Sequence, residues 1–350
     1  MIRKSAKRLV KSYLDWSFHL DHKKKAHKIL KSIESVKGKT DPKLIKISDE
    51  YATDILGWEG YAPWLYVYSA MNNKFKEGWI PDNYYGKIVV PKLKGYYGTI
   101  SEYNSLTSRL FNSSYLPDCA YYTNGLWISP EYQILSDKEI IEIAFNNNAR
   151  VVYKIDNSLQ GVGVHILEKD NFNIDKLKML GNGVLQKYIR QHSFFQEIMP
   201  SSVVTLRVTS VVDDKGIVTV RACYLRIARS FDTLVRSYSH IRVSVDSSTG
   251  VLDKYGYTTK WHQIENHPDT GFKFENKKIP DFEKIVDTMI NLHKMVPFVR
   301  TIGWDVILNE NNDVQVMEWN GTENDIKFSE ATNGPCFSGL GWEDLWKKGN

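Results

Sequence analysis

VVYKIDNSLQGVGVHIL, residues 151–167, places a lysine inside a β-branched run and then turns through two glycines. Lys154 lies in the first run, and Gly161 and Gly163 precede the second. Two apolar runs around glycines predict a β-hairpin. Glycine lets backbone N–H groups approach an anion, and a lysine ammonium attracts phosphate, so this hairpin is a candidate flap over phosphate groups. The alternative is an ordinary hairpin with a solvated lysine.

Two other phosphate-binding loops do not fit this stretch. A Walker-type loop needs its glycines between a strand and a helix and ends in Lys-Ser or Lys-Thr, whereas a second strand follows here. A Rossmann fingerprint needs a third glycine and a helix, and both are missing.

A second hairpin is predicted where GWDVIL (303–308) and VQVMEW (314–319) flank a polar turn. Asp305 lies in the first run, and Glu318 and Asn320 share one face at the end of the second by period-two alternation. Folding the hairpin brings Asp305 opposite Met317 or Glu318. Two carboxylates at one place repel each other unless a cation compensates them, and carboxylate and amide oxygens suit magnesium. The alternative is a surface hairpin with polar residues pointing outward.

The remaining pattern predicts an α+β protein with long antiparallel sheets. Residues 40–90 are rich in Trp and Tyr and indicate a packed irregular or mixed segment. Helices are expected over 101–111, 137–148 and 281–296, and further strands over 183–189, 203–212 and 216–229.

Size and composition indicate a globular protein of two or three domains or subdomains. The chain has 350 residues, of which 42% are hydrophobic and 25% charged. It contains neither an apolar run of about 18 residues nor a signal-peptide core. Three widely spaced cysteines favour neither a disulfide framework nor a zinc site, so a reducing cytoplasm is the expected location.

The net charge of +5 comes from one end of the sequence. Residues 1–31 carry ten Lys or Arg against two acids, which is +8, so the other residues sum to −3. Charge confined to one end argues against a nucleic-acid-binding protein. Leu9, Tyr13, Trp16 and Leu20 follow helical spacing among these cations. The alternatives are docking on anionic lipid and a terminal helix that packs its apolar stripe on the protein.

The two hairpins and the segment between them resemble a known family. KIDNSLQGVGV resembles the lysine and glycine flap of ATP-grasp enzymes, and IGWDVIL with VMEWNG resembles their metal hairpin. VLQKYIRQHSFFQEIMPSSVVTLRVTS, VDSSTG, NHPDTGF and KKIPDFEKIV resemble the sugar-transfer associated branch. The likeness covers roughly residues 100–330. It implies an ATP-grasp fold, in which two α+β subdomains clamp ATP between antiparallel sheets. The expected division is 1–100 (basic helix and aromatic-rich segment), 101–190 (small subdomain) and 191–350 (large subdomain).

The resemblance also implies site residues. Lys154 would hold the α- and β-phosphates under a flap that contains Ser158, Gly161 and Gly163. Two magnesium ions would be bound by Asp305, Glu318 and Asn320. The adenine would meet backbone groups of the hinge Gln186, Lys187, Tyr188 and Ile189, and Gln191 or His192 occupies the position of the usual ribose-binding acid.

The chain departs from the family pattern at two positions. Asn104 stands where relatives usually carry another phosphate-binding lysine, so Lys94 and Arg109 are candidates to replace it. Gly303 stands where many ligases of this fold carry a cation.

Two strand arginines are candidates for that cationic role. Arg207 shares a strand face with Thr205 and Thr209, and Arg226 lies in the next predicted strand. An arginine inside a sheet either pairs with an acid or presents its guanidinium fork to the γ-phosphate and the reacting carboxylate.

The resemblance implies an enzyme that activates a carboxylate with ATP. The γ-phosphoryl group passes to the carboxylate, and an amine attacks the acyl phosphate to form an amide. From the family name we expect a sugar acid of a surface-polysaccharide precursor, joined to an amino acid or simple amine. The alternatives are an ATP-grasp kinase that phosphorylates a hydroxyl and a nucleotide-binding protein without catalysis. A cytoplasmic location is expected, and contact of residues 1–31 with the inner face of the membrane stays an open alternative. No nucleic-acid partner is expected. The sequence leaves the oligomeric state open.

Overall fold

The computed structural model describes residues 2–111, 114–146, 148–158, 163–232, 239–322 and 324–347, with side chains from residue 10 onward. The chain forms two compact units. The first contains Met1–Gly95, Lys260–Gln263 and Asp325–Asn350, and the second contains Tyr96–Thr259 and Ile264–Asn324. The C-terminal segment therefore joins the first unit, whereas the sequence division groups it with the large subdomain.

The first unit is helical. It contains α1 (Ile2–Lys37), α2 (Pro42–Asp54), α3 (Ala62–Asn72), α4 (Asp82–Tyr84), α5 (Val90–Leu93) and α11 (Lys327–Asn333). The Asp41 side chain caps α2 by accepting a hydrogen bond from the Lys43 N–H (2.8 Å), and Pro42 occupies the first turn. Residues 40–90 are thus mostly helical rather than irregular. Helix α3 is buried on nearly all sides, so its sequence lacks the one-sided apolar stripe that signals a helix.

The second unit begins with a six-stranded sheet in the order β3-β2-β1-β6-β4-β5, and all neighbouring pairs are antiparallel. The β4–β5 pair confirms the predicted first hairpin. Helix α7 (Asp137–Phe145) begins with a Ser136–Glu139 capping box, and α8 (Ile174–Leu180) follows β5. The strands are β1 (Asp118–Thr123), β2 (Leu126–Ile128), β3 (Ile134–Leu135), β4 (Arg150–Ile155), β5 (Val164–Glu168) and β6 (Gly183–Lys187).

A seven-stranded sheet follows in the order β11-β10-β9-β8-β7-β12-β13. In this order, each neighbouring pair from β10 through to β13 is antiparallel. The β12–β13 pair confirms the predicted second hairpin. The strands are β7 (Thr205–Val212), β8 (Val218–Ile227), β9 (Ile241–Val245), β10 (Leu252–Tyr257), β11 (Gln263–Ile264), β12 (Thr301–Leu308) and β13 (Val314–Asn320).

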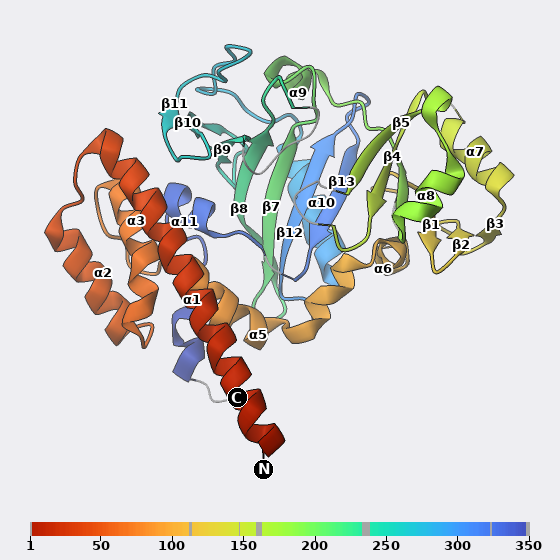
Figure 1. Cartoon of the computed structure of the whole chain (residues 1–350). Coiled ribbons are helices and arrows are strands. Elements are labelled where there is room, and N and C mark those ends of the chain that lie inside the picture. The colour runs from red at the N-terminus through yellow and green to blue at the C-terminus, as the bar shows by residue number, and fades with distance from the viewer. Residues whose placement is uncertain are drawn as a thin grey trace. The chain divides into compact units, whose positions relative to one another are not determined.

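Helix α10 (Phe282–Met295) covers one face of this sheet, behind β7, β8 and β13 (Figure 1). Its apolar residues Phe282, Ile285, Met289 and Leu292 are buried, as the amphipathic pattern predicts. Trp304 in β12 is fully buried and stacks on Trp319 with ring centroids 6.2 Å apart. The expected helix over 101–111 is shorter than predicted, because only α6 (Thr107–Phe111) is α-helical and 3₁₀ turns precede it.

The α+β prediction is confirmed by these helices and two antiparallel sheets. Among the described residues, none of the helices combines the length and the apolar character needed to cross a membrane.

Candidate active site

Lys154 links the two predicted hairpins. It lies in β4 opposite Val164 of β5 and Val184 of β6. Its ammonium group donates a 2.8 Å hydrogen bond to the backbone carbonyl of Met317 in β13. Burial lowers the pKa of Lys154, and the carboxylates of Glu318, Asp118 and Asp305 oppose that shift. The lysine of the first hairpin and the acids of the second therefore face the same place.

Asp305 and Glu318 are direct cross-strand partners in the β12–β13 hairpin. Opposed residues in an antiparallel pair project from the same face, so their carboxylates are neighbours. Asp305 is only 5% exposed, whereas Glu318 is exposed. Gly303 pairs with Asn320, whose side-chain amide donates to the Gly303 carbonyl at 3.1 Å.

Two arginines of the same sheet hold Asp305, one from β7, which neighbours β12, and one from β8, the strand beyond it. Arg207 of β7 donates from Nε to Oδ1 at 2.6 Å and from Nη2 to Oδ2 at 3.0 Å. Arg226 of β8 donates from Nη1 to Oδ2 at 3.1 Å. Of the two expected roles for a strand arginine, pairing with an acid is present at both positions, and the acid is the predicted metal ligand.

These charges set the protonation of the two carboxyl groups in opposite directions. Burial alone would raise the pKa of Asp305, but Arg207 and then Arg226 outweigh it and lower the pKa. Although part of the Glu318 side chain is exposed, desolvation by the surrounding protein and the nearby Asp305 raise its pKa, against Lys154 and the arginines. Asp305 is therefore the firmly ionised member of the pair, and Glu318 is the member that an added cation would keep ionised.

The donor set fits magnesium only with help from outside the protein. No group of three His, Cys, Asp or Glu side chains in the described part of the chain could hold a metal ion. The two carboxylates and the Asn320 amide supply three oxygen-bearing side chains, and magnesium typically completes its shell with water and substrate phosphates. The residues thus suit an ion that arrives with a phosphorylated ligand.

The surroundings of Gly303 leave no space for a side chain. A Cβ atom at Gly303 would lie 2.1 Å from Asn324 Oδ1 and 3.2 Å from Arg207 Nη1. Asn324 is fully buried, accepts a 3.0 Å hydrogen bond from Arg207 and donates to Thr209 at 2.8 Å. The guanidinium of Arg207 thus lies, from β7, directly beside Gly303.

The flap is described only in part. Ser158 donates to the Ile155 carbonyl at 2.7 Å, and the Ile155 N–H donates to the Gly163 carbonyl at 3.0 Å. A Cβ at Gly163 would lie 2.4 Å from the Ser158 Cβ, so only glycine fits there without movement. Gly161 lies outside the described residues.

Asn104 is bound to Asp156 through two hydrogen bonds. Its backbone and side-chain N–H groups both donate to Asp156 Oδ1, at 3.2 and 2.7 Å, which fixes the residue two positions after Lys154. The candidate replacements lie elsewhere. Lys94 belongs to the first unit, and the Arg109 guanidinium lies over the Tyr132 ring at 5.0 Å.

The hinge residues differ in their contacts. Gln186 is buried and donates to Asp118 Oδ1 at 2.7 Å. The Lys187 N–H donates to the Pro117 carbonyl, the Tyr188 ring lies 5.8 Å from the Arg150 guanidinium, and Ile189 packs on the apolar core.

Asp118 is a residue that sequence reasoning missed. It also accepts a 2.6 Å hydrogen bond from the Tyr121 hydroxyl, and burial raises its pKa. A lone acid at the start of a strand, after Leu116-Pro117, was its only signal.

Gln191 is engaged inside the protein. Its Nε2 donates to the carbonyls of Met199 (2.7 Å) and Ser202 (3.0 Å), and its Oε1 accepts from the Val204 N–H (2.9 Å). Both amide hydrogens are therefore used. His192 caps α9 (Ser193–Ile198) by accepting from the Phe194 N–H at 3.1 Å. In this arrangement the Gln191 amide has no N–H group left for a ribose. Of the two His192 ring nitrogens, only Nε2 is available to one, because Nδ1 forms the cap.

The cavity between the two sheets is narrow. It measures about 20 Å³ and is lined by Asn104, Asp118, Gln186, Met317 and Glu318, among others. A nucleotide needs several hundred Å³, so binding requires the β4–β5 hairpin to move away from β13 and the Lys154–Met317 bond to break. A larger cavity of about 460 Å³ lies between β5 and α8, but none of the predicted site residues lines it. The charges identify the narrow cavity as the candidate site.

Comparison with known proteins bears on the same segment. The sequence model of the sugar-transfer associated ATP-grasp family matches residues 169–340, which begins after the β4–β5 hairpin. No curated protein matches the chain.

Three solved structures are examples of chains that this one resembles. The ATP-grasp ligase PsnB with a minimal precursor has 14% identity over 72% of this chain and 64% of its own, with a TM-score of 0.41. N5-carboxyaminoimidazole synthetase from Staphylococcus aureus with ADP has 10% identity over 67% and 48%, with a TM-score of 0.40. D-alanine–D-alanine ligase from Coxiella burnetii has 10% identity over 71% and 59%, with a TM-score of 0.38. This chain thus spans less than two thirds of each. Residues 169–340, just under half of the chain, are thus similar to the sugar-transfer associated ATP-grasp family, and the two antiparallel sheets expected from that resemblance are both present.

Proposed function

We propose that the protein is an ATP-dependent carboxylate–amine ligase that forms an amide through an acyl phosphate. The observation that carries the proposal is the contact of Lys154 with Met317 beside the Asp305–Glu318 pair, because it brings one ammonium from one sheet close to two carboxylates of the other. Similarity to the family favours ATP as the nucleotide. Catalysis then depends mainly on positioning and on charge neutralisation.

The cationic residues divide the binding work. Lys154 exchanges the Met317 carbonyl for the α- and β-phosphates when the flap opens and closes again. Ser158, Gly161 and Gly163 cover the phosphates, and the hinge backbone from Gln186 to Ile189 meets the adenine.

The acidic hairpin holds the metal in this proposal. Asp305, Glu318 and Asn320 would bind two Mg²⁺ ions, which neutralise charge on the β- and γ-phosphates when bound. Asp305 uses both oxygens on arginines, so at least Arg226 must share or release it when an ion binds.

The two arginines have different tasks. Arg207 is buried and is fixed by Asp305 and Asn324, so it positions the metal-binding carboxylate. Arg226 is 21% exposed and uses one nitrogen on Asp305. Its other N–H groups are available to the substrate carboxylate and the γ-phosphate, so Arg226 is the catalytic candidate of the pair.

The acceptor we propose is a sugar acid of a surface-polysaccharide precursor, joined to an amino acid or a simple amine. This part is supported by the family description alone. A screen of sugar acids against amines, with ADP release and product mass as readouts, tests it.

Hydroxylamine trapping separates the ligase from its main rival. An acyl phosphate yields a hydroxamate with hydroxylamine, whereas a kinase that phosphorylates a hydroxyl yields none. Asn104 in place of the usual lysine favours a third outcome, nucleotide binding without turnover. Absence of ADP release with every carboxylate, despite ATP binding, would establish that outcome.

A further inference from the structure

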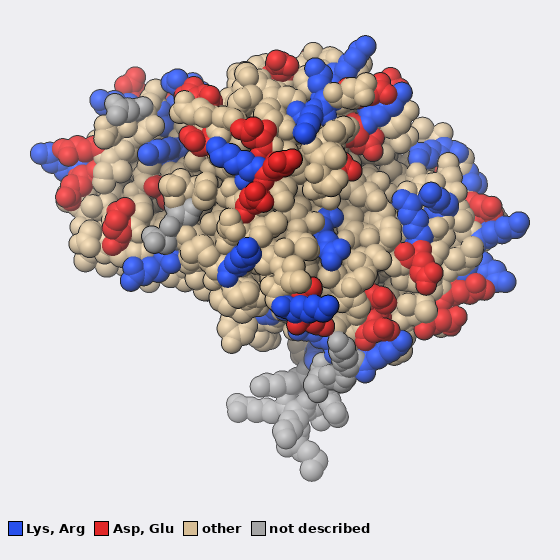
Figure 2. Space-filling view, turned by 180° about the vertical axis from the view of Figure 1, so that it is seen from behind, with Lys and Arg blue, Asp and Glu red and all other residues tan. Residues whose placement is uncertain are grey.

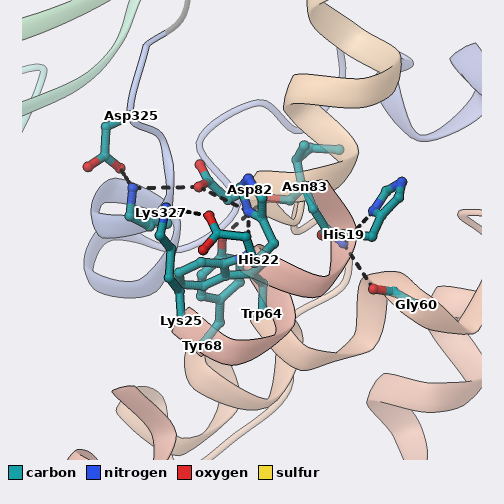
Figure 3. Close-up of polar contacts among 12 residues, drawn as sticks. His19, His22, Lys25, Gly60, Trp64, Tyr68, Asp82, Asn83, Asp325 and Lys327 are labelled. Atoms are coloured by element: carbon teal, nitrogen blue, oxygen red, sulfur yellow. Dashed lines mark hydrogen bonds and ion pairs between the residues drawn. The ribbon is translucent and has the colours of Figure 1, made fainter. Parts of the chain in front are cut away.

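Helix α1 is anchored to the first unit along one side. Figure 3 shows His19 and His22 from this helix pointing toward Asp82 and Asn83. The Trp64 indole N–H donates to His22 Nδ1 at 3.1 Å, His22 Nδ1 lies 3.7 Å from Asp82 Oδ2, and the Asn83 amide lies 3.4 Å from His19 Nδ1. Because the indole N–H donates to Nδ1, His22 is neutral in this arrangement.

The anchored side continues along the helix. Ala26 and Ile33 are buried at the spacing of His22, and Asp15 pairs with Lys87. Burial, Lys87 and His22 lower the pKa of His19 to about 4, and burial with Lys327 does the same for His22. Neutral histidines therefore hold α1 in place throughout the physiological pH range.

The first part of the helix exposes large apolar side chains instead. Val10, Tyr13, Leu14 and Trp16 are 59%, 64%, 59% and 59% exposed. At 3.6 residues per turn they occupy the half of the helix that faces away from the anchored side. The expectation that the apolar stripe packs on the protein is therefore wrong for Tyr13 and Trp16.

The same segment carries a concentrated positive charge. Residues 2–16 contain five cations (Arg3, Lys4, Lys7, Arg8 and Lys11) and one acid, Asp15. On the face shown in Figure 2, by contrast, Lys and Arg are interspersed with Asp and Glu. A cation-rich sequence that also carries the exposed Tyr13 and Trp16 matches an anionic lipid surface, where aromatic rings enter the interface and cations meet headgroups. A second copy of the chain fits poorly, because two such segments would repel each other.

We propose that residues 2–16 of α1 dock this protein on a bilayer that contains anionic lipid. The apolar side chains enter the headgroup region, the cations attract the lipid phosphates, and the anchored part of the helix fixes the segment to the first unit. This proposal is independent of the ligase chemistry, which involves residues of the second unit.

Vesicle flotation of the full chain tests the proposal. The probes are phosphatidylcholine vesicles with and without one third phosphatidylglycerol, and we expect binding only to the anionic ones, with release at high salt. Lys11→Gln should weaken partitioning about fivefold, the change that corresponds to ~1 kcal/mol per cation. The double variant Tyr13→Ser/Trp16→Ser should weaken it at least about tenfold.

Lys28→Gln is the matched control. It removes one exposed lysine of the same helix roughly 25 Å further along the axis, beyond the screening length at physiological salt. It should bind as the unchanged chain does. All variants should keep the far-UV circular dichroism, because these side chains are exposed.

Three results would overturn the proposal. The first is no binding to the anionic vesicles. The second is an equal loss in Lys28→Gln and Lys11→Gln, which would show a diffuse charge effect. The third is a dimer in sedimentation velocity that the Tyr13→Ser/Trp16→Ser variant abolishes, because a second copy would then cover this face.

Discussion

The guanidinium of Arg207 grips Asp305 through two hydrogen bonds of 2.6 and 3.0 Å, one to each carboxylate oxygen. Both side chains are buried, so removing the Asp305 carboxylate leaves the Arg207 charge without its counter-charge, although Asn324 still accepts one of its hydrogen bonds. Asp305 is thus both the proposed metal ligand and the counter-charge of a buried arginine.

Asp305→Asn should therefore cost both stability and activity. Breaking a buried ion pair on one side typically costs about 3 kcal/mol, so the free energy of unfolding should fall by roughly that amount. Magnesium-dependent ATP turnover should be lost as well. Chemical denaturation and an ADP-release assay measure the two effects.

Glu318→Gln should separate the loss of turnover from the loss of stability. Glu318 is exposed, and its carboxylate makes no hydrogen bond in the described part of the chain, so its loss should change the unfolding free energy by less than about 1 kcal/mol. Turnover should still fall steeply. Intact magnesium-dependent turnover in Glu318→Gln would remove this residue from the metal site.

Arg226→Ala should raise KM for the carboxylate substrate and lower kcat, with little change in nucleotide affinity. The reason is that Arg226 is partly exposed and uses only one nitrogen on Asp305. Arg221→Ala on the same strand is the control, because Arg221 contacts Thr219 and none of the site residues. Equal kinetics in the two variants would contradict the assignment of Arg226.

Gly303→Ala should disturb the site from behind. The added methyl group would collide with the Asn324 amide, which supports Arg207. We expect at least a tenfold loss of turnover, about 1.4 kcal/mol, with the nucleotide still bound. A fully active Gly303→Ala enzyme would show that Arg207 needs no such support.

The first unit should respond to pH through Glu330. Burial raises the pKa of Glu330 from 4.5 to about 8, against hydrogen bonds from the N–H groups of Ile80 and Cys336. The folded chain then binds this proton more tightly than the unfolded chain. The stabilisation of the folded chain by this bound proton is therefore fully present below about pH 4.5. It is lost as the pH rises through about 8.

Thermal unfolding at several pH values checks this. The fall in stability between about pH 5 and about pH 8 should be shallower in Glu330→Gln than in the unchanged chain. An identical slope would mean that Glu330 ionises normally. Glu343→Gln, which alters a carboxyl group in the C-terminal 3₁₀ turn, serves as the control.

The sequence predicts the two hairpins well because their signals are local. Alternating β-branched residues around glycine or asparagine turns specify both. Turn length leaves Met317 and Glu318 as possible partners of Asp305, and a register shift between Val306 and Asp305 brings Glu318 opposite it. Helix α3, which contains Trp64 and Tyr68, is not predicted by the sequence pattern, because a helix buried on nearly all sides shows no apolar stripe.

The candidate site was harder to predict where it depends on distant contacts. Asp118 carries no motif and joins the cavity only through pairing of β1 with β6. The grip of Arg207 on Asp305 joins residues 98 positions apart on neighbouring strands, a pairing that no local pattern encodes. Likewise, the three hydrogen bonds that occupy Gln191 depend on the fold of the loop after α9.

The ammonium of Lys154 and the acids of the β12–β13 hairpin should bind one nucleotide together. Calorimetric titration of ATP, with and without Mg²⁺, into the unchanged chain, Lys154→Ala and the exposed-lysine control Lys176→Ala tests it most directly. We expect Mg²⁺-dependent binding that Lys154→Ala weakens at least tenfold, about 1.4 kcal/mol, and that Lys176→Ala leaves unchanged. Equal ATP affinity in Lys154→Ala and the unchanged chain would contradict the claim.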